Sequence, residues 1–167
     1  MITTASDIIR FQPAASSLLA ADGEHCRVTR ERATTACPKM LAECAAAFEG
    51  WSKTPVQDRV RGLKSLADEL EKSRDLFCDV LMEEIGATAF WANHNVTLAA
   101  KTLIETVSYA ETVAQNRHPI QDANVHSYAV NEPLGVCLAI TPWNAPLILG
   151  ARAIAMALLC GNTVLLK

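Results

Sequence analysis

The chain has 167 residues, of which 50% are hydrophobic, and its 15 basic and 18 acidic side chains leave a net charge of −3. This balance argues against nucleic acid or an anionic membrane surface as a partner, and the length is compatible with one domain. A membrane span is not expected either, because the apolar C-terminal part is interrupted at 141–146 and carries Arg152.

The cysteines and histidines predict no metal site. None of the six cysteines forms a C-x-x-C pair or lies at metal-ligand spacing from a histidine, and no two of the four histidines are four residues apart. The cysteines are interpreted as reduced, mostly buried side chains of a cytoplasmic protein. The N-terminus agrees with this location, because it lacks the basic segment, followed by an apolar segment, that is typical of a signal peptide.

The first part of the chain predicts an irregular segment and then two helices. Residues 1–33 are expected to be irregular, and a helix is expected over 35–48 with Pro38 in its first turn. Thr54–Gln57 is typical of a capping box and predicts a second helix from Pro55. The charged residues of that helix, Arg59 among them, would form its solvated face. Its inward residues would be Val60, Leu63, Ala67 and Leu70.

Two more helices and one strand are predicted next. A helix would begin after Ser73 and end at Gly86, and a longer one would run from Thr88 to about Ala114 without a break. Residues 126–130 alternate between polar and apolar and predict a half-exposed strand. The apolar positions of the two helices include Leu76, Phe77, Val80, Leu81, Phe90, Trp91 and Leu103.

The C-terminal part predicts a strand, a helix and a second strand. Residues 136–140 form an apolar run, which suits a strand buried on both faces. Pro146 is expected in the first turn of the helix, and Gly161 just past its end. With a second strand at 163–166, these elements form one βαβ unit, expected to be parallel and right-handed.

A candidate ligand site lies at one edge of this unit, because ligands of open parallel sheets bind beyond the carboxyl ends of the strands. Asn144 follows the first strand and Lys167 the second, so their polar heads are expected to converge. From the residues alone, Asn144 either donates to a developing oxyanion or caps the helix that follows. Lys167 is either a ligand contact or an ordinary lysine at a strand end.

The same stretch carries a family resemblance. A Gly-Val-x-x-x-Ile strand is followed by Pro-Trp-Asn-x-Pro, an apolar helix, Cys-Gly-Asn-Thr-Val and a lysine. This pattern resembles the aldehyde dehydrogenase superfamily, and most of all its branch of salicylaldehyde and vanillin dehydrogenases. The resemblance extends from about Met40 to Lys167, is specific from Glu132, and corresponds to roughly the first third of a family chain. It implies an α/β fold in which N-terminal helices precede a strand and the βαβ unit, as an incomplete cofactor-binding domain over 34–167.

The resemblance implies roles for the residues at this edge. Asn144 would be the catalytic oxyanion donor, and Lys167 would bind the adenosine ribose of NAD or NADP. The nicotinamide end of the cofactor would lie against Ile140, Thr141, Pro142 and Trp143. No G-x-G-x-x-G is present, so the phosphate-binding fingerprint of a Rossmann fold gives no support.

The resemblance also implies a small aldehyde as substrate and a homo-oligomer as the complete enzyme. Arg152 would bind a ring hydroxyl and Trp91 would stack on an aromatic ring, although Arg152 could instead pair with a carboxylate and Trp91 could be core. A strand near 126–131 would pair between subunits, as an edge strand can. The implied substrate residues are Trp91, Ala145, Leu149 and Arg152.

The family reaction needs a cysteine nucleophile and a glutamate base, and both lie beyond Lys167 in a family chain. Cys137 and Cys160 are expected in structural positions, in a strand and at a helix end. The sequence is therefore interpreted as an N-terminal fragment that is inactive alone, with an exposed apolar sheet. The alternative is a non-catalytic helical module that kept the oligomerisation surface of the family.

Overall fold

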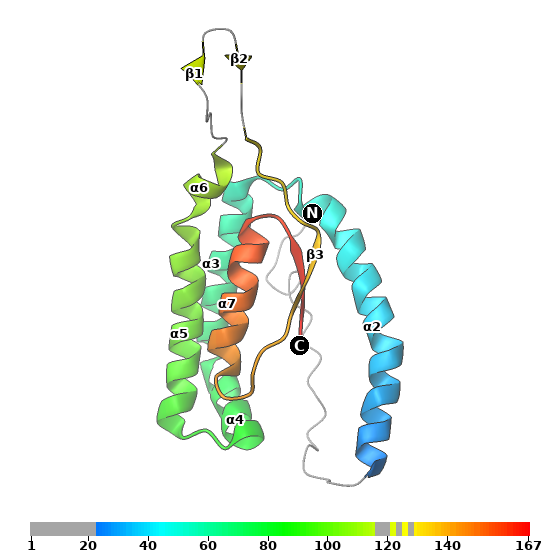
Figure 1. The fold of residues 1–167 in the computed structure, drawn as a ribbon. Helices are drawn as coiled ribbons and strands as arrows, with labels where there is room; N and C mark the ends of the chain where they lie inside the picture. Colours follow the sequence, from blue (N-terminus) through cyan, green and yellow to red (C-terminus); the bar gives the residue numbers. More distant parts are fainter. Residues whose placement is uncertain (1–22, 116–120, 123–124, 127–128) are drawn as a thin grey trace.

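The computed structural model describes residues 23–115, 121–122, 125–126 and 129–167. The elements in chain order are α2 (Gly23–Trp51), α3 (Val56–Lys72), α4 (Arg74–Ile85), α5 (Ala89–Val107), α6 (Ala110–Ala114), β1 (Gln121–Asp122), β2 (Val125–His126), β3 (Val136–Ala139), α7 (Pro146–Leu159) and β4 (Thr163–Leu166). Helices α3, α5 and α7 lie side by side, and strands β3 and β4 lie between α7 and α2 (Figure 1). The fold is thus mostly helical with a small parallel sheet.

The predicted βαβ unit is confirmed. β3 and β4 are parallel neighbours, with Val136 opposite Thr163 and Ala139 opposite Leu166. α7 connects them, and it begins at Pro146 and ends before Gly161 as predicted. Gly161 has a φ of 90°, a left-handed conformation that glycine adopts without the steric cost of a side chain.

The Asn162 side chain ties the end of α7 to the start of β3. Its Nδ2 donates to the carbonyl of Ala157 at 3.1 Å, and its Oδ1 accepts from the backbone N–H of Gly135 at 3.0 Å. The N–H of Thr163 then donates to the Gly135 carbonyl at 3.2 Å. Because Asn162 is buried, these bonds satisfy an amide that would otherwise be costly to bury. They hold the two strands in register at their first residues.

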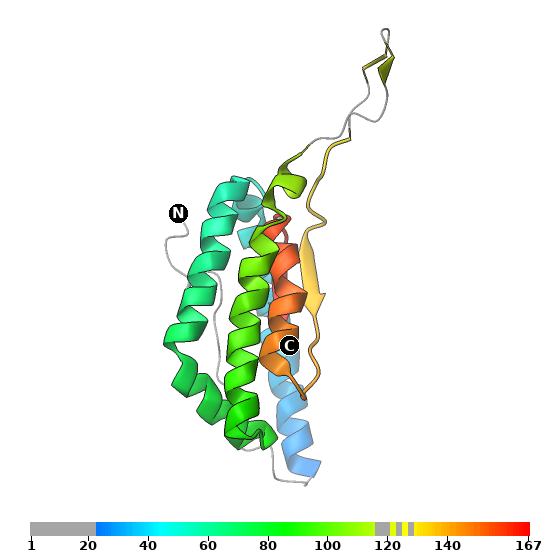
Figure 2. The ribbon, with the colours of Figure 1, turned by 90° about the vertical axis from the view of Figure 1, so that its left-hand side faces the viewer.

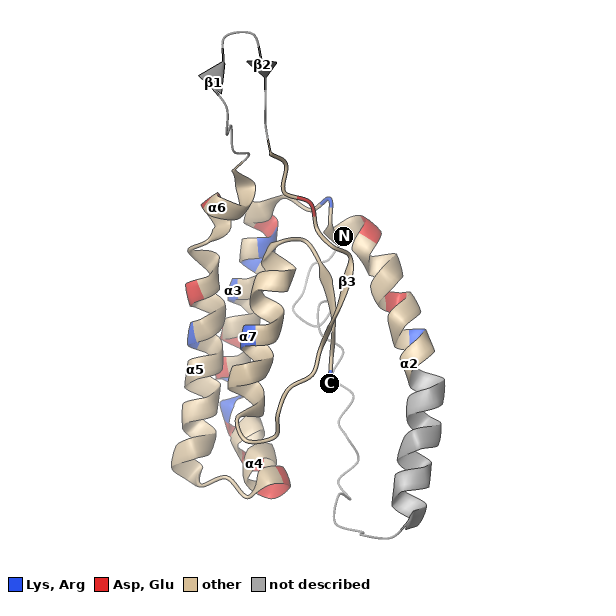
Figure 3. Ribbon diagram, viewed as in Figure 1, with Lys and Arg blue, Asp and Glu red and all other residues tan. Residues whose placement is uncertain are grey.

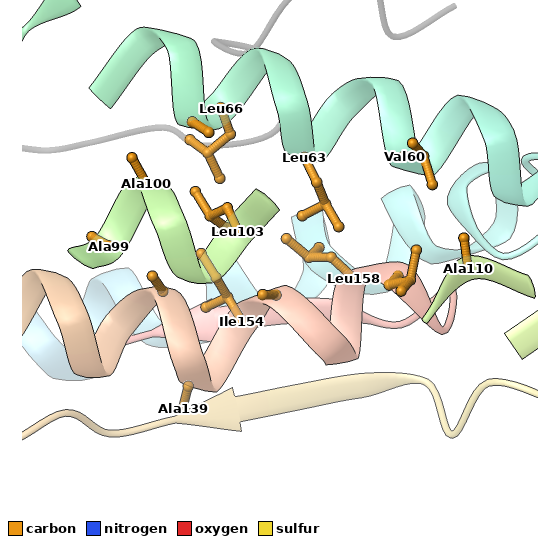
Figure 4. Packing of buried hydrophobic residues seen from close by; sticks show 14 of the residues in the cluster. Val60, Leu63, Leu66, Ala99, Ala100, Leu103, Ala110, Ala139, Ile154 and Leu158 are labelled. Atoms are coloured by element: carbon orange, nitrogen blue, oxygen red, sulfur yellow. The ribbon is translucent and has the colours of Figure 1, made fainter. Parts of the chain in front are cut away.

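The main core is formed where α3, α5 and α7 meet. Leucines and alanines of the three helices converge there, and Ala139 of β3 points toward α7 from the sheet (Figure 4). At the other side of this core, the indole N–H of Trp51 donates to the carbonyl of Leu158 at 3.1 Å and so joins the end of α2 to α7. Core members include Val60, Leu63, Leu66, Ala99, Ala100, Leu103, Ile154 and Leu158.

Several predictions for the helices are wrong. α2 begins at Gly23, so part of the segment expected to be irregular is helical, while residues 1–22 lie outside the described part. Arg, Glu and Ala before Pro38 favour helix, and they extend it N-terminally although proline removes one backbone hydrogen bond. The capping box does not form: Pro55 is the N-cap of α3, and the Thr54 hydroxyl donates to the Gly50 carbonyl instead.

The predicted helix over 88–114 is interrupted. α5 ends at Val107 and α6 begins at Ala110, because the Ser108 hydroxyl donates to the Glu105 carbonyl at 2.7 Å and competes with the helical hydrogen-bond ladder. Phe90 and Leu76, which were expected to face inward, are exposed.

Two predictions for the strands are also corrected. β3 is not buried on both faces, because its sheet has two strands and the Leu138 side chain is 67% exposed. Of the strand expected at 126–130, the described part shows β2 at Val125–His126, paired antiparallel with β1. These two strands lie away from the helices (Figure 2). Among the described helices, none is long and apolar enough to cross a membrane.

The core predicts a measurable contrast between two leucines. We expect Leu103→Ala to lower the free energy of unfolding by about 2–5 kcal/mol, because Leu103 is fully buried in the main core and its truncation leaves a cavity. Leu134→Ala is the matched control, since Leu134 is almost wholly exposed, and it should change the value by less than about 0.5 kcal/mol. Urea unfolding followed by circular dichroism measures both, and equal losses would contradict the assigned core.

Candidate functional site

The candidate site is the loop between β3 and α7 together with the end of β4. The strand ladder continues into this loop: the N–H of Lys167 donates to the Ala139 carbonyl at 2.8 Å, and the N–H of Thr141 donates to the Lys167 carbonyl at 2.9 Å. The Thr141 hydroxyl donates to the same carbonyl at 3.1 Å. The structure therefore joins Thr141 to the Lys167 backbone at the strand ends, whereas the convergence of the Asn144 amide and the Lys167 ammonium stays a prediction.

Much of the predicted cofactor surface is open. Ile140, Pro142, Trp143 and Lys167 are exposed, whereas Thr141 is half-buried. β3 and the loop after it carry no charged side chain, in contrast to the helices, where both signs are mixed (Figure 3). An uncharged, largely apolar strip with one lysine at its edge is therefore available for a ligand that combines flat rings with hydroxyl groups.

Asn144 is held in place through its backbone carbonyl. The indole N–H of Trp91 in α5 donates to the Asn144 carbonyl at 3.0 Å, so a residue 53 positions earlier fixes the loop. The helix-capping interpretation of Asn144 is wrong, because the N-cap of α7 is Ala145 and no side chain caps it. The exposed Asn144 amide has no hydrogen bond within the described residues and is free to donate to a bound oxygen.

The Trp91 side chain is neither buried in the core nor free of contacts with other residues. It is partly exposed, and its indole packs on the His94 imidazole with ring centroids 5.5 Å apart and planes 29° apart. His94 also stacks on Phe90, with centroids 6.0 Å apart. This aromatic cluster (Phe90, Trp91 and His94) therefore lies at the start of α5, beside the loop that carries Asn144.

The other predicted substrate residues differ in exposure. Ala145 is buried and is the N-cap of α7, so it precedes the first turn of the helix that carries the other two. Leu149 is half-buried and Arg152 is exposed, one turn apart on α7. The alternative that Arg152 pairs with a carboxylate finds no support among the described residues, where Arg152 has no ion pair. α7 also approaches the strands closely, since a Cβ on Gly150 would lie 3.7 Å from Leu166.

The cysteines occupy structural positions. Cys137 lies half-buried in β3, and Cys160 is the C-cap of α7. Burial, and secondarily the charge of Glu43, raises the pKa of the Cys44 thiol, whose Sγ donates to the Val164 carbonyl at 3.8 Å. In the described part of the chain, no group of three or more His, Cys, Asp or Glu side chains is placed to hold a metal ion.

The most unusual polar residue is one that the sequence placed on the surface. Arg59 is 7% exposed, and its Nε is buried without a hydrogen-bond partner. Burial lowers the pKa of this guanidinium, and the neighbouring Cys160 opposes that effect. The sequence does contain a signal for this burial. Arg59 lies four residues before Leu63 and seven before Leu66, which is the spacing of the buried face of α3. The solvated-face prediction is therefore wrong for this residue.

Arg59 lines a cavity of about 660 Å³ at the opposite end of α7 from Asn144. The cavity is formed between the start of α3, α6, the chain before β3 and the end of α7. Its lining is Ser52, Arg59, Thr112, Val113, Val130, Asn131, Glu132, Pro133 and Cys160.

Comparison with known proteins gives a consistent result. The pattern of the Aldehyde dehydrogenase family matches residues 15–167. The chain is similar to a salicylaldehyde dehydrogenase of Pseudomonas sp. (strain C18), with 37% identity over 142 residues that cover 84% of this chain and 29% of the relative. It is also similar to a vanillin dehydrogenase of Pseudomonas sp. (strain HR199 / DSM 7063), with 40% identity over 127 residues, 76% of this chain and 26% of the relative.

Solved structures agree. A salicylaldehyde dehydrogenase from Pseudomonas putida G7, complexed with salicylaldehyde, superposes with a TM-score of 0.74 at 36% identity, over 80% of this chain and 28% of the other. An NAD-dependent benzaldehyde dehydrogenase from Corynebacterium glutamicum gives a TM-score of 0.68 at 32% identity, over 74% and 27% of the two chains. The chain thus spans less than a third of the length of each of these four relatives.

The Trp91 hydrogen bond predicts an effect on the loop. We expect Trp91→Phe to lower the free energy of unfolding by about 0.5–1.5 kcal/mol and to speed amide hydrogen exchange over 143–147, because the Asn144 carbonyl loses its partner. Phe90→Leu is the control, since Phe90 is 78% exposed and has no hydrogen-bonding group in its side chain. Exchange measured by mass spectrometry should be unchanged in the control, and an unchanged loop in Trp91→Phe would disprove the restraint.

Proposed function

This chain belongs to the aldehyde dehydrogenase family, and we propose that it is the N-terminal part of an NAD(P)-dependent enzyme that oxidises an aromatic aldehyde to its carboxylic acid. The observation that carries the proposal is the exposed side-chain amide of Asn144, which has no hydrogen bond with any described residue and lies in a loop anchored by Trp91. In this role, the chain supplies the oxyanion donor and part of the dinucleotide groove.

The chemistry proposed for Asn144 is electrostatic. When a nucleophile attacks an aldehyde, the carbonyl oxygen gains negative charge, and an amide N–H aimed at it stabilises that charge. A donor that is already oriented costs no rearrangement at the moment of reaction. The hydrogen bond from Trp91 to the Asn144 carbonyl supplies such orientation, because it fixes the backbone to which the amide is attached.

The open strip beside Asn144 fits a nicotinamide dinucleotide. In the proposal, Ile140, Pro142 and Trp143 contact the nicotinamide end, and the Lys167 ammonium donates to hydroxyls of the adenosine ribose. Thr141 contributes to the shape of the cofactor surface more than to hydrogen bonds with the cofactor, since its hydroxyl already donates to the Lys167 carbonyl. When bound, the nicotinamide ring would accept the hydride that leaves the substrate. The exposure of these side chains supports the proposal, because none has to move out of a core.

The aromatic class of the aldehyde is proposed from the relatives and from the residues near Asn144. Relatives named for salicylaldehyde and vanillin share 37–40% of the residues in the matched region. Trp91 offers an aromatic face, although its N–H is engaged, and Arg152 is an exposed cation on α7 that could bind a ring hydroxyl. Ala145 and Leu149 would line the channel between them.

The nucleophilic cysteine and the general-base glutamate are proposed to lie outside these 167 residues. Cys137 lies in β3, and Cys160 is the C-cap at the opposite end of α7 from the Asn144 loop, so both are assigned structural positions. The chain alone is therefore proposed to be inactive. We also propose a cytoplasmic location, because unpaired cysteines are typical of reducing compartments.

A second candidate function is a non-catalytic oligomerisation module. The β1–β2 pair favours it, since these short strands lie away from the helices (Figure 2) and offer unpaired edges to a partner chain. The same feature serves the homo-oligomer proposed for the complete enzyme. Binding of the cofactor therefore separates the two candidates better than assembly does.

Titration of NAD into the 167-residue chain by calorimetry tests the groove. We expect binding in the micromolar range, and we expect Lys167→Met to weaken it about tenfold through the loss of a charged hydrogen-bond donor. Lys64→Met is the control, because Lys64 is an exposed lysine on α3, and it should leave the affinity unchanged. Absence of NAD binding would favour the oligomerisation module.

A chimera tests the role of Asn144. Residues 15–167 would replace the matched segment of the Pseudomonas putida salicylaldehyde dehydrogenase, and oxidation of salicylaldehyde would be measured. We expect Asn144→Ala to lower kcat of this chimera by about 100–1,000-fold, the usual effect of losing one oxyanion donor. Gln57→Ala removes an exposed amide on α3 and should have no effect. Equal rates for both variants would argue against the oxyanion role.

A further inference from the structure

Arg59 and its cavity form a second polar site, which the proposed dehydrogenase function does not use. α7 begins at the Asn144 loop and ends beside the cavity, so the two sites are separated by the length of a 14-residue helix, about 21 Å. The cavity volume of about 660 Å³ is in the range of small-molecule sites.

The Arg59 side chain is 7% exposed, and its Nε–H group is buried without a hydrogen-bond acceptor among the described residues. It forms no ion pair and no hydrogen bond with any described residue, although a guanidinium carries five N–H donors. Burying an unpaired charge is costly, and native proteins nearly always supply a partner. A group that fills this position would therefore bind with a gain in free energy that no exposed arginine could give.

The surroundings of Arg59 explain why it stays at this position. Its Nη1 lies 2.7 Å from where a Cβ on Gly161 would be, so only glycine allows the guanidinium to approach the end of α7. The negative end of the helix dipole stabilises a cation there. The dipole does not supply a hydrogen-bond acceptor to Arg59. The carbonyls of Met156, Ala157 and Leu158 in the last turn accept from backbone N–H groups, from Asn162 and from Trp51.

The cavity lining indicates the kind of ligand. The hydroxyls of Ser52 and Thr112 line the same space and can donate to an anion. Glu132 lies at the exposed rim, where its carboxylate repels multiply charged anions more than singly charged ones. Val113 and Pro133 add apolar walls that suit the body of an organic acid.

We propose that this cavity binds a small organic monocarboxylate, whose carboxylate accepts two parallel hydrogen bonds from the Arg59 guanidinium. The planar fork of arginine matches a carboxylate in this way, and such charged, two-point hydrogen bonds are stronger than neutral ones. The apolar part of the acid lies against Val113 and Pro133. This binding site is independent of Asn144 and Lys167.

The test uses the 167-residue chain labelled with ¹⁵N at arginine, with benzoate as the probe. The Nε–H resonance of Arg59 is assigned by its loss in Arg59→Met. We expect saturable movement of this resonance and slower exchange of its proton with water as benzoate is added. Benzamide, which has the same shape without the charge, should leave the resonance unchanged. Movement with benzamide equal to that with benzoate would overturn the proposal, as would tighter binding of inorganic phosphate.

Variants identify the anchor by thermal unfolding. In the unmodified chain, benzoate should raise Tm, and above its Kd the rise should grow with the logarithm of the benzoate concentration. Arg59→Met should fold, with an unchanged or higher Tm, because an apolar side chain of similar volume replaces an unpaired buried charge. Benzoate should no longer raise its Tm. Arg61→Met is the matched control, since Arg61 is exposed and paired with Asp58 one turn away, and it should keep the full benzoate effect.

Two further variants keep the proposal testable if Arg59→Met does not fold. Arg59→Lys retains the charge but not the fork, and we expect a benzoate Kd about tenfold higher. Glu132→Gln removes the carboxylate at the rim, and we expect tighter binding of benzoate. If benzoate binds only to the Glu132→Gln variant, the Glu132 carboxylate itself pairs with the Arg59 guanidinium in solution. That result would overturn the proposal of a free carboxylate ligand.

Discussion

The buried amide of Asn162 is the interaction on which the arrangement of the C-terminal half depends. A helix and a strand that follow one another could meet an earlier strand in several registers. Asn162 selects one of them, because its side chain bonds both the last turn of α7 and the first residue before β3. A one-residue slip of β4 against β3 would lose the bond to Gly135 and would turn the side chains of that strand to the opposite face.

That register decides what α7 can present at its two ends. At its start, the strand ladder continues through Thr141 to Lys167, so the loop leaves the sheet at a defined point and reaches Trp91 with its Asn144 carbonyl. At its end, Gly161 lies against the guanidinium of Arg59. One rigid helix thus positions both the proposed oxyanion donor and the proposed carboxylate site, and the close approach at Gly150 keeps it against the strands.

The helices on the other side of α7 hold the proposed sites in position more than they supply reactive groups to them. α3 and α5 build a core of leucines and alanines that holds α7, and α5 also supplies Trp91 to the loop. Small alanine side chains at the contacts let the three helices approach closely, as in Figure 4. The uncharged strip on β3 and its loop is then left open at the surface, where a dinucleotide is proposed to bind.

The sequence by itself determined the elements whose limits are marked locally. Pro146 and Gly161 mark the two ends of α7, and apolar runs predict β3 and β4. Together, these signals were sufficient to predict a parallel βαβ unit and to reveal the family resemblance. These features are decided by backbone conformation and periodicity, which act over a few residues. Only the tertiary structure decided what each face meets: Arg59 is buried because α3 packs beside the end of α7, and Leu138 is exposed because none of the described strands and helices covers it. The Trp91 bond to Asn144 was equally beyond the sequence, since hydrogen bonds between distant segments depend on packing that periodicity does not specify.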